Sequence, residues 1–434
     1  MKFIPLIVML SSILLDARNI TFAELKDSAL LHSDRLSLRL IDTKIEEAHL
    51  GSVYSTLYPQ LSLGYSGEYN RNLDDTSSES ISVGDTTINS SVAYEHSVAL
   101  KLNYELYHFG STLKQIEISK KEVAVKKLDK CSEEIKIYQE LLDNYVRAQK
   151  AQSEKVFKSQ MQILRRELYT IKQRLYSAGR ESRISVGDEA IRLIDIERDI
   201  KNAQLEFKES VIALCKLSYI DLSTSDTNLM ALNANTFVNK ILSFSNTPQA
   251  LTYEEKILQK NAEISMLKRN QLPVISLYSN YYLYGSDAHN TYDGFNDLSP
   301  NSWNAGLSLR WNIFEGFKYN SESSRLRLEL QRLRKEAELS KREFDYETRT
   351  SQEKLESLSL LKQNQAEALD EARHKLIMTQ RLRTQGEVDA VSEVSVKLEV
   401  LERELTLENE NIQHAYESEK LRLQHMEAAQ CTQH

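Results

Sequence analysis

The sequence predicts an α+β fold in which one unit of strands and long helices occurs twice, and three observations lead to this prediction. The chain of 434 residues contains only 12 glycines and 5 prolines, while 27% of its residues are charged, a composition that favours long uninterrupted helices. Four segments alternate apolar and polar residues with the period of a β-strand. Short motifs in the first half recur in the same order about 207 residues later, which indicates an internal duplication.

The duplication is clearest around the predicted strands. Pro59–Leu63 (PQLSL) recurs as Pro273–Leu277 (PVISL). Leu100–Tyr107 (LKLNYELY) recurs as Leu307–Phe314 (LSLRWNIF), with apolar or aromatic residues at corresponding positions. Because these landmarks keep the same order, with Gly179 and Gly386 as a third pair, we interpret the two halves as one unit, duplicated.

Each half is predicted to contribute two β-strands. In the last of them Trp303, Leu307 and Leu309 alternate with polar residues, and each predicted strand has about ten residues or more, enough to cross a bilayer at a tilt. A water-soluble sheet with one buried face is the alternative, but the strand lengths and the aromatic residues near the strand ends favour lipid on the apolar face. The strands are expected at about residues 59–72, 92–108, 273–286 and 302–314, joined in pairs by polar loops at 72–91 and 287–301.

Two long helical hairpins are predicted after the strand pairs. Residues 111–178 and 318–385 contain neither proline nor glycine, so each is expected to form one helix about 100 Å long. Gly179 and Gly386 then interrupt the helical pattern. Glycine is the usual residue where a helix ends and the chain reverses, whereas a glycine tolerated inside a longer helix is the alternative. The hairpins are expected over about 111–217 and 317–427, with their tips near these glycines.

The remaining segments are assigned from composition. The apolar run from Phe3 to Leu15 is too short to span a bilayer and has the length of the apolar part of a secretory signal, with the start of a buried helix as the alternative. No apolar run of about 18 residues follows it, so no helix is expected to cross a membrane. The expected segments are a signal peptide at 1–17, structural repeats at 18–217 and 249–427, a linker at 218–248 packed around the helical body, and a C-terminal tail at 428–434.

The composition argues against an enzyme and against a nucleic-acid-binding protein. The chain has no phosphate-binding loop, no dinucleotide-binding glycine motif and no zinc-protease motif, and its nine histidines are scattered. The net charge of −8 is spread along the chain without a basic stripe. We therefore expect no catalytic residue, no cofactor, no metal ligand and no nucleic acid partner.

The three cysteines, Cys131, Cys215 and Cys431, are an odd number, which leaves at least one thiol free or paired between chains. Cys131 lies 48 residues before Gly179, and Cys215 lies 36 residues after it. In a regular hairpin this difference separates the two cysteines by about 18 Å along the hairpin axis, which is beyond the reach of a disulfide. We therefore expect no intrachain disulfide.

Four strands are too few to close a barrel by themselves, because side chains alone fill the interior of a barrel of about eight strands. Open strand edges are not tolerated in lipid, so other copies of the chain are expected to complete the barrel. Two copies would give eight strands, and three copies would give twelve strands and a conducting pore, continued by a coiled-coil barrel of helices. The polar side chains expected to line this lumen are those of Glu68, Lys101, Glu105 and Arg310.

Together these motifs resemble those of the TolC-like outer membrane efflux protein family, from about Ile20 to Leu423. The resemblance depends on the two proline-led strand starts described above, on YELYHFG ending at Gly110 and WNIFEG ending at Gly316, and on the LYxxG and LRxxG motifs at the tips. It implies a homotrimer with a twelve-stranded barrel in the outer membrane of a Gram-negative bacterium and a twelve-helix tunnel across the periplasm. It also implies docking of the tips onto a periplasmic adaptor and an inner-membrane pump of the RND or ABC type.

The resemblance also directs attention to particular tip residues. Ser182 and Asp389 match a small polar or acidic residue that the family often has three positions after each tip glycine. Two carboxylates that narrow the tunnel in TolC correspond here to Ser392 and Ser395, so that acidic ring is not reproduced. Another ring from Asp188, Asp389 and Glu393 is an alternative. Five arginines near the first tip are either adaptor contacts or ordinary solvated helix surface: Arg165, Arg166, Arg174, Arg180 and Arg183.

The favoured function is therefore a passive exit duct of a tripartite export system. Small-molecule efflux and type I protein secretion both fit, because the pump selects the cargo. A non-conducting periplasmic coiled-coil scaffold or adaptor is the rival from another class, although such proteins lack four alternating strands.

Overall fold

The computed structural model describes residues 18–71, 92–222, 227–232, 243–287, 289–426 and 428–431. The chain divides into two compact units. We call the first the helical unit; it contains residues 18–41, Lys127–Leu251 and Ala337–His434. The second, the strand unit, contains Asp42–Lys126 and Thr252–Glu336. The expected signal peptide at 1–17 and the first polar loop at 72–91 lie outside the described residues.

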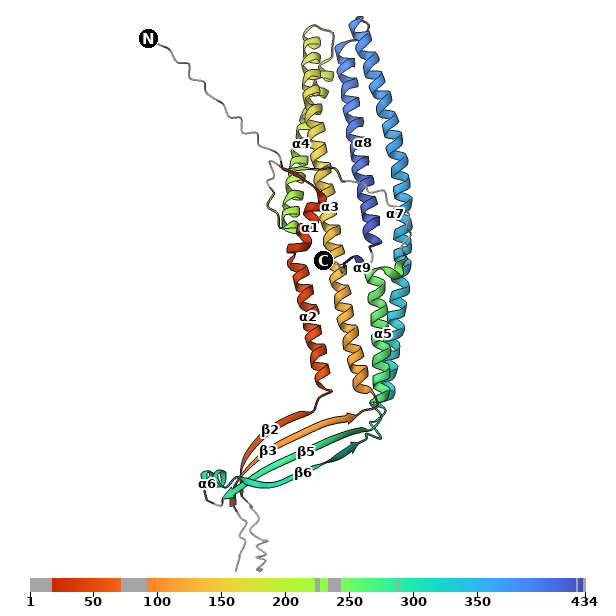
Figure 1. Ribbon diagram of the computed structural model, residues 1–434. Coiled ribbons are helices and arrows are strands. Elements are labelled where there is room, and N and C mark those ends of the chain that lie inside the picture. The colour runs from red at the N-terminus through yellow and green to blue at the C-terminus, as the bar shows by residue number, and fades with distance from the viewer. Residues whose placement is uncertain are drawn as a thin grey trace, which may run out of the picture. The chain divides into compact units, whose positions relative to one another are not determined.

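The strand unit is built on one four-stranded antiparallel sheet with the order β2-β3-β5-β6 (Figure 1). Each strand therefore lies beside its neighbour in sequence order, with β3 and β5 joining the two halves of the chain. The strands are β2 (Gln60–Arg71), β3 (Val92–Tyr107), β5 (Val274–Asp287) and β6 (Ser299–Arg310).

The fourth strand starts and ends earlier than its expected span of 302–314. Its last residue, Arg310, pairs with Val274, and the residue before Val274 is Pro273. Proline has no backbone N–H to continue the ladder, so β6 has no partner beyond this point. Trp311 leaves the sheet, and its indole Nε1 donates to the carbonyl oxygen of Gln271 at 3.0 Å.

The second polar loop contains a short helix, α6 (Thr291–Asn296), that the sequence pattern did not reveal. α6 packs against β3 and β5 at the loop end of the sheet (Figure 1). The contact depends on two glycines: a Cβ on Gly285 would lie 2.4 Å from the carbonyl oxygen of Gly294, and one on Gly294 would lie 2.8 Å from that of Tyr94. Below α6, His96 is buried and contacts the hydroxyls of Tyr65 and Thr291 at 2.8 and 3.1 Å.

The helices of the molecule occupy most of both repeats. Two of them, α3 and α7, have 67 residues each, because no proline or glycine interrupts them. Each is followed by a return helix; α1, α2 and α5 precede the strand pairs, and α9 follows the last return helix. The helices are α1 (Phe22–His32), α2 (Asp34–Ser55), α3 (Ser111–Ser177), α4 (Arg183–Ser218), α5 (Pro248–Arg269), α7 (Lys318–Thr384), α8 (Ala390–Gln424) and α9 (Ala428–Cys431).

The core of the helical unit forms where α1 packs on the α3–α4 hairpin. The ring of Phe22 meets the rings of Tyr138 and Tyr145 edge-on, each at 5.3 Å. Side chains that are completely buried here come from all three helices: Leu25, Leu141, Leu142, Tyr145, Val211 and Leu214. Burial of this apolar surface is the main stabilising term for the hairpin.

The segment expected as a linker contains a short strand, β4 (Thr227–Leu229), which pairs in parallel with β1 (Arg18–Ile20), and a 3-10 helix, η2 (Phe244–Asn246). Tyr145 of α3 donates its hydroxyl to the carbonyl oxygen of Met230 at 2.6 Å. The described part of this segment is therefore fastened to the helical body through its backbone.

A disulfide joins Cys131 of α3 to Cys431 of α9, so the expectation of no intrachain disulfide is wrong. Cys131 and Cys215 are indeed unpaired with each other, and Cys215 has a free thiol. Cys131 lies 48 residues before the first tip glycine and Cys431 lies 45 residues after the second. The two cysteines therefore lie at nearly the same distance from the tips of two different hairpins. From the sequence we compared Cys131 only with Cys215 of its own hairpin and therefore missed this partner.

No helix among the described residues has the length and apolar character that a membrane span requires.

Candidate functional site: helical tips and sheet faces

Both helical hairpins reverse through the same backbone turn. Gly179 and Gly386 have positive φ angles of 70° and 80°. The amide of Gly179 donates to Tyr176 and that of Arg180 to Leu175, the two bonds of a Schellman turn. At the second tip the amide of Gly386 donates to Arg383 and that of Glu387 donates to Leu382, which are the same two bonds. A glycine is favoured here because a side chain strains the left-handed region.

Ser182 and Asp389 begin the return helices. The Ser182 hydroxyl accepts from the backbone N–H of Ser185 at 3.1 Å, and the Asp389 carboxylate accepts from that of Ser392 at 2.8 Å. These N-terminal caps satisfy amides that have no partner inside a helix. The hydrogen bond from Ser392 lowers the pKa of Asp389 below its ordinary value, so this carboxylate is charged at neutral pH.

Glu393, one of the expected tunnel residues, is buried in an ion-pair cluster at the second tip. Its carboxylate pairs with Lys397 of the same helix at 2.7 Å and with Arg383 of α7. Both cations hold the pKa of Glu393 below its ordinary value, with Lys397 the larger cause. In this arrangement its charge is balanced, and the side chain connects α7 to α8.

The first tip contains a buried carboxylate that the sequence analysis did not single out. Glu189 is 0% exposed, and its oxygens lie 3.2 Å from Arg165, 3.4 Å from Lys172 and 3.8 Å from Arg192. Arg165 also reaches Glu402 of α8 at 3.5 Å. Arg165, which sequence reasoning grouped with possible adaptor contacts, is thus mainly an internal partner of Glu189. A glutamate among regularly spaced charges gives no sequence signal of its burial.

The other predicted tip residues, Arg183, Asp188, Ser392 and Ser395, have exposed side chains. Ser395 donates its hydroxyl to the carbonyl oxygen of Val391 within the helix at 2.8 Å. Exposed residues at a hairpin end are free for contact with another molecule.

The sheet register brings the four expected lumen residues to one face. Lys101 pairs with Ser62 of β2 and Asn280 of β5, Glu105 pairs with Ser276, and Arg310 pairs with Val274. Successive side chains of a strand alternate between faces, so Glu68 lies on this same face. We call it the polar face; it also carries Ser62, Ser66, Ser97, Asn280, Asn304 and Ser308.

The opposite face, which we call the apolar face, is strongly exposed in a single chain. Leu63, Trp303 and Leu307 are 73%, 73% and 67% exposed. Monomeric soluble proteins rarely present so large a continuous apolar surface, so this face is expected to lie against lipid or protein. Its exposed members also include Leu61, Tyr65, Tyr69, Leu100, Tyr281 and Leu309.

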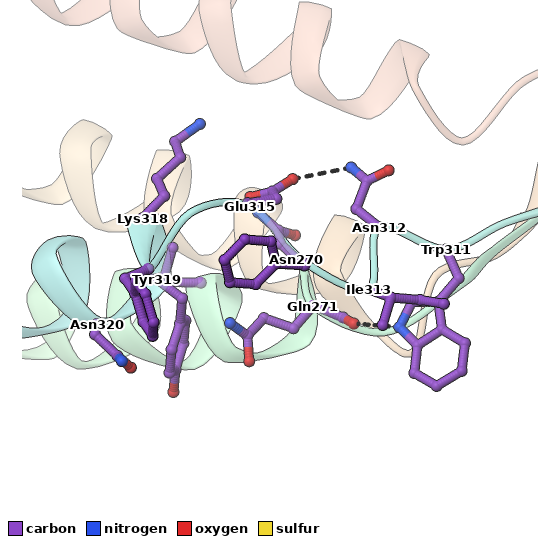
Figure 2. A pocket seen from close by; sticks show the side chains of 12 residues that line it. Asn270, Gln271, Trp311, Asn312, Ile313, Glu315, Lys318, Tyr319 and Asn320 are labelled. Carbon is purple, nitrogen blue, oxygen red and sulfur yellow. Dashed lines mark hydrogen bonds between the residues drawn. The ribbon is translucent and has the colours of Figure 1, made fainter.

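An aromatic junction follows β6 in the strand unit. Figure 2 shows Trp311, Ile313 and neighbouring side chains that line a pocket. The volume of this pocket is about 700 Å³. Phe314 and Phe317 line it as well and are exposed. Aromatic side chains at a strand end suit a membrane–water interface. A tryptophan there places its apolar ring against lipid while its N–H group meets polar partners.

Both junctions between a strand pair and a long helix use two consecutive left-handed residues. In the first these are Phe109 and Gly110, and in the second they are Gly316 and Phe317. The two pairs are 207 residues apart, and the order is Phe-Gly in the first junction and Gly-Phe in the second. The turn geometry thus recurs even where the residue order does not.

The chain thus combines an antiparallel sheet that has one exposed apolar face with two long helical hairpins. Residues 28–218 match the family model described as "Outer membrane efflux protein", and this confirms the predicted family resemblance. This stretch is therefore similar to the outer membrane efflux protein family.

Solved structures with the same fold include two channels and one further outer membrane protein. The CmeC outer membrane channel of Campylobacter jejuni matches with a TM-score of 0.77 and 15% identity, over 95% of this chain and 88% of that one. CusC matches with a TM-score of 0.76 and 17% identity, over 93% and 91%. The outer membrane protein VceC of Vibrio cholerae matches with a TM-score of 0.73 and 13% identity, over 93% and 94%. A comparison with curated protein sequences finds no match.

Proposed function

We propose that three copies of this chain form an outer-membrane channel that passively conducts substrates delivered by an inner-membrane pump and a periplasmic adaptor. The observation that carries the proposal is the four-stranded sheet, whose apolar face is exposed and whose outer strands, β2 and β6, each pair on one side only among the described residues.

The free edges argue for more than one copy. An unpaired backbone group in lipid costs several kcal/mol, so an open edge strand is unstable there. Pairing of β6 in one copy with β2 in the next removes all edges when the ring closes. A ring of three copies has twelve strands and room for a conducting lumen, whereas an interior of about eight strands is filled by side chains.

The polar face supports a conducting role in such a ring. If the apolar face contacts lipid, the carboxylates of Glu68 and Glu105 and the cations of Lys101 and Arg310 face the lumen. Charges of both signs in a wide lumen predict weak ion selectivity. The chain in this proposal is a duct, and the pump supplies the energy and selects the cargo.

Planar-bilayer recording of the purified, detergent-extracted protein tests the proposal. We expect stable, large single-channel steps from a preparation whose mass corresponds to three chains. A single-copy, water-soluble and electrically silent protein would contradict it and favour a non-conducting periplasmic scaffold. Cargo is a separate question: a neighbouring gene for a protein-secreting ABC pump would favour type I secretion over small-molecule efflux.

The tips are proposed to dock onto the adaptor through residues near Ser182, Arg183, Asp188 and Asp389. Gly386→Pro is expected to abolish export without lowering the yield of trimer, because proline cannot adopt the positive φ of this turn. Ser182→Arg is expected to do the same by adding bulk at the first tip. Export is measured in cells that carry the matching pump and adaptor.

Gly51→Ala is the matched control, because Gly51 lies within helix α2, outside the tips, and a Cβ there meets nothing within 4 Å. Export by this variant should equal that of the unmodified chain. Normal export by Gly386→Pro and Ser182→Arg would remove the tips from the docking role.

A further inference from the structure

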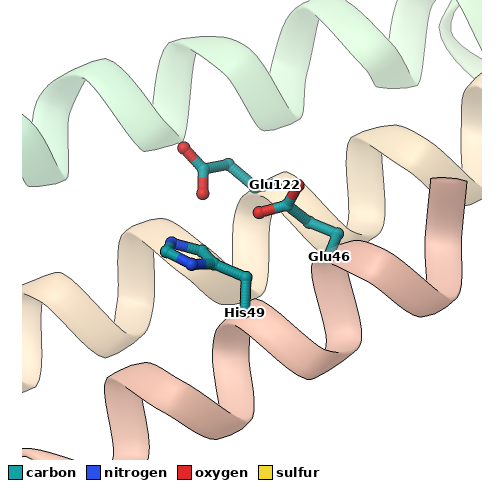
Figure 3. A group of neighbouring side chains, drawn as sticks. All are labelled: Glu46, His49 and Glu122. Atoms are coloured by element: carbon teal, nitrogen blue, oxygen red, sulfur yellow. The ribbon is translucent and has the colours of Figure 1, made fainter.

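Three side chains with metal-binding chemistry meet between helices of the strand unit. Glu46 and His49 belong to α2, and Glu122 belongs to α3. One ligand atom from each lies within 4.8 Å of those of the other two. Figure 3 shows the two carboxylates and the imidazole turned toward one another between the helices. The channel proposal uses none of these residues.

The spacing on α2 explains how two of these groups meet. Residues three apart lie on the same face of an α-helix, so Glu46 and His49 project together toward α3. The same Glu-x-x-His spacing supplies carboxylate and imidazole ligands in metal-binding helical bundles, where a glutamate from another helix completes the set. Here Glu122 occupies the place of that glutamate.

We infer that Glu46, His49 and Glu122 bind one divalent transition-metal ion, and that Zn²⁺ fits the site best. One nitrogen and two carboxylate ligands suit Zn²⁺, whereas Mg²⁺ and Ca²⁺ prefer sites made wholly of oxygen. Three protein ligands leave a position for water. A hollow of about 620 Å³ beside the group, lined also by Ile45, Val125, Lys126 and Gln259, has room for it.

The charges of the group favour a cation between the carboxylates. The carboxylates of Glu46 and Glu122 lie close together, so they repel each other when both are charged. Glu263 of α5 adds a further negative charge, and His49 and Lys126 are basic groups beside the two carboxylates. A divalent ion bound between the carboxylates removes their repulsion.

A hydrogen bond from a third helix orients one ligand. The side-chain amide of Gln259 on α5 donates to one oxygen of Glu122 at 2.9 Å, which leaves the other oxygen for a metal. Outer partners of this kind fix ligand orientation in known metal sites. Metal–ligand bonds of about 2.0–2.2 Å place the ligand atoms within about 4 Å of each other. Small rotations of the Glu46 and His49 side chains are therefore enough to bring all three ligand atoms into contact with one ion.

Equilibrium dialysis of the full-length protein against Zn²⁺ tests the inference. The protein is purified in detergent without a polyhistidine tag and stripped with EDTA, and bound metal is counted by mass spectrometry. We expect one Zn²⁺ per chain. His49→Ala and Glu122→Gln should weaken binding by about a hundredfold or more, and Gln259→Leu should weaken it by about tenfold.

Two variants serve as matched controls: Glu47→Gln, beside the site on α2, and His374→Ala, an exposed histidine on α7. Both should bind Zn²⁺ as the unmodified chain does. Equal binding by the controls and by His49→Ala would show an adventitious ion only and overturn the inference, as would no binding at micromolar Zn²⁺. Channel conductance of the same samples separates this result from the proposed function, which does not depend on the metal.

Discussion

Glu189 shows how a single residue organises the first tip. A fully buried carboxylate is stable only when cations and hydrogen bonds replace its water, and three basic side chains surround this one. Because Arg165 also contacts Glu402, the same group connects the α3–α4 hairpin with α8. This contact lies within the helical unit and stabilises the tip proposed for docking.

Replacing Arg165 with Met is expected to lower the stability of the first tip by about 2 kcal/mol. This is less than the roughly 3–5 kcal/mol for breaking an isolated buried pair, because Lys172 and Arg192 still face Glu189. Hydrogen exchange of the tip amides measures the local opening free energy. The neighbouring Arg166→Met is the control: Arg166 is exposed and lies 3.6 Å from Glu197, so its loss should cost less than about 1 kcal/mol.

The second tip is expected to loosen at acid pH through Glu393. Lys397 and Arg383 lower the folded-state pKa of this carboxylate, so its contribution to stability is present above its unfolded pKa of about 4.3 and is lost as the pH falls through the folded value. The opening free energy of the α7–α8 tip amides, obtained from hydrogen exchange after correction for the pH dependence of intrinsic exchange, should therefore be steady from neutral pH to about pH 5 and fall below it. In Glu393→Gln this additional fall should be absent; its persistence would show that another group is responsible.

Among the elements, α9 depends most clearly on a covalent bond. A helix of four residues has too few hydrogen bonds to persist alone, and the disulfide to Cys131 holds it beside α3. The two bonded cysteines are 300 residues apart. The bond therefore joins the end of the second hairpin to the first.

Cys431→Ser is expected to release the C-terminal segment. Carboxypeptidase should then remove residues beyond α8 that resist digestion in the unmodified chain. Maleimide labelling of the denatured protein provides a direct check, with one reactive thiol per chain before reduction and three after it. Cys215→Ser, which removes the free thiol, should not change the digestion; three labels before reduction would contradict the disulfide.

For the whole molecule, the two sheet faces decide whether the chain enters a membrane. Leu307→Arg places a cation on the apolar face and is expected to cost about 2–4 kcal/mol near the middle of a bilayer. Ser308→Arg is the matched control, because the adjacent residue of β6 points to the polar face. Membrane fractionation should show loss of Leu307→Arg from the outer membrane and retention of Ser308→Arg. Equal behaviour of the two variants would contradict the assignment of the faces.

Local sequence alone determined the features that depend on neighbouring residues. Strand alternation placed Glu68, Lys101, Glu105 and Arg310 on one face, because side-chain direction in a strand has a fixed period of two. The tip turns were also predictable, since a glycine is the residue that adopts positive φ at little cost. These preferences act over a few residues, and no distant contact overrides them here.

The tertiary structure decided what distant residues do together. The Cys131–Cys431 bond, the burial of Glu189, the packing of α6 on Gly285 and the meeting of Glu122 with His49 all join segments far apart in the chain or depend on which helix face is covered. Charged residues recur along every helix, so their order does not reveal which of them lie opposite one another. Only the packing of helices and strands sets those distances, and with them the ion pairs and the proposed metal site.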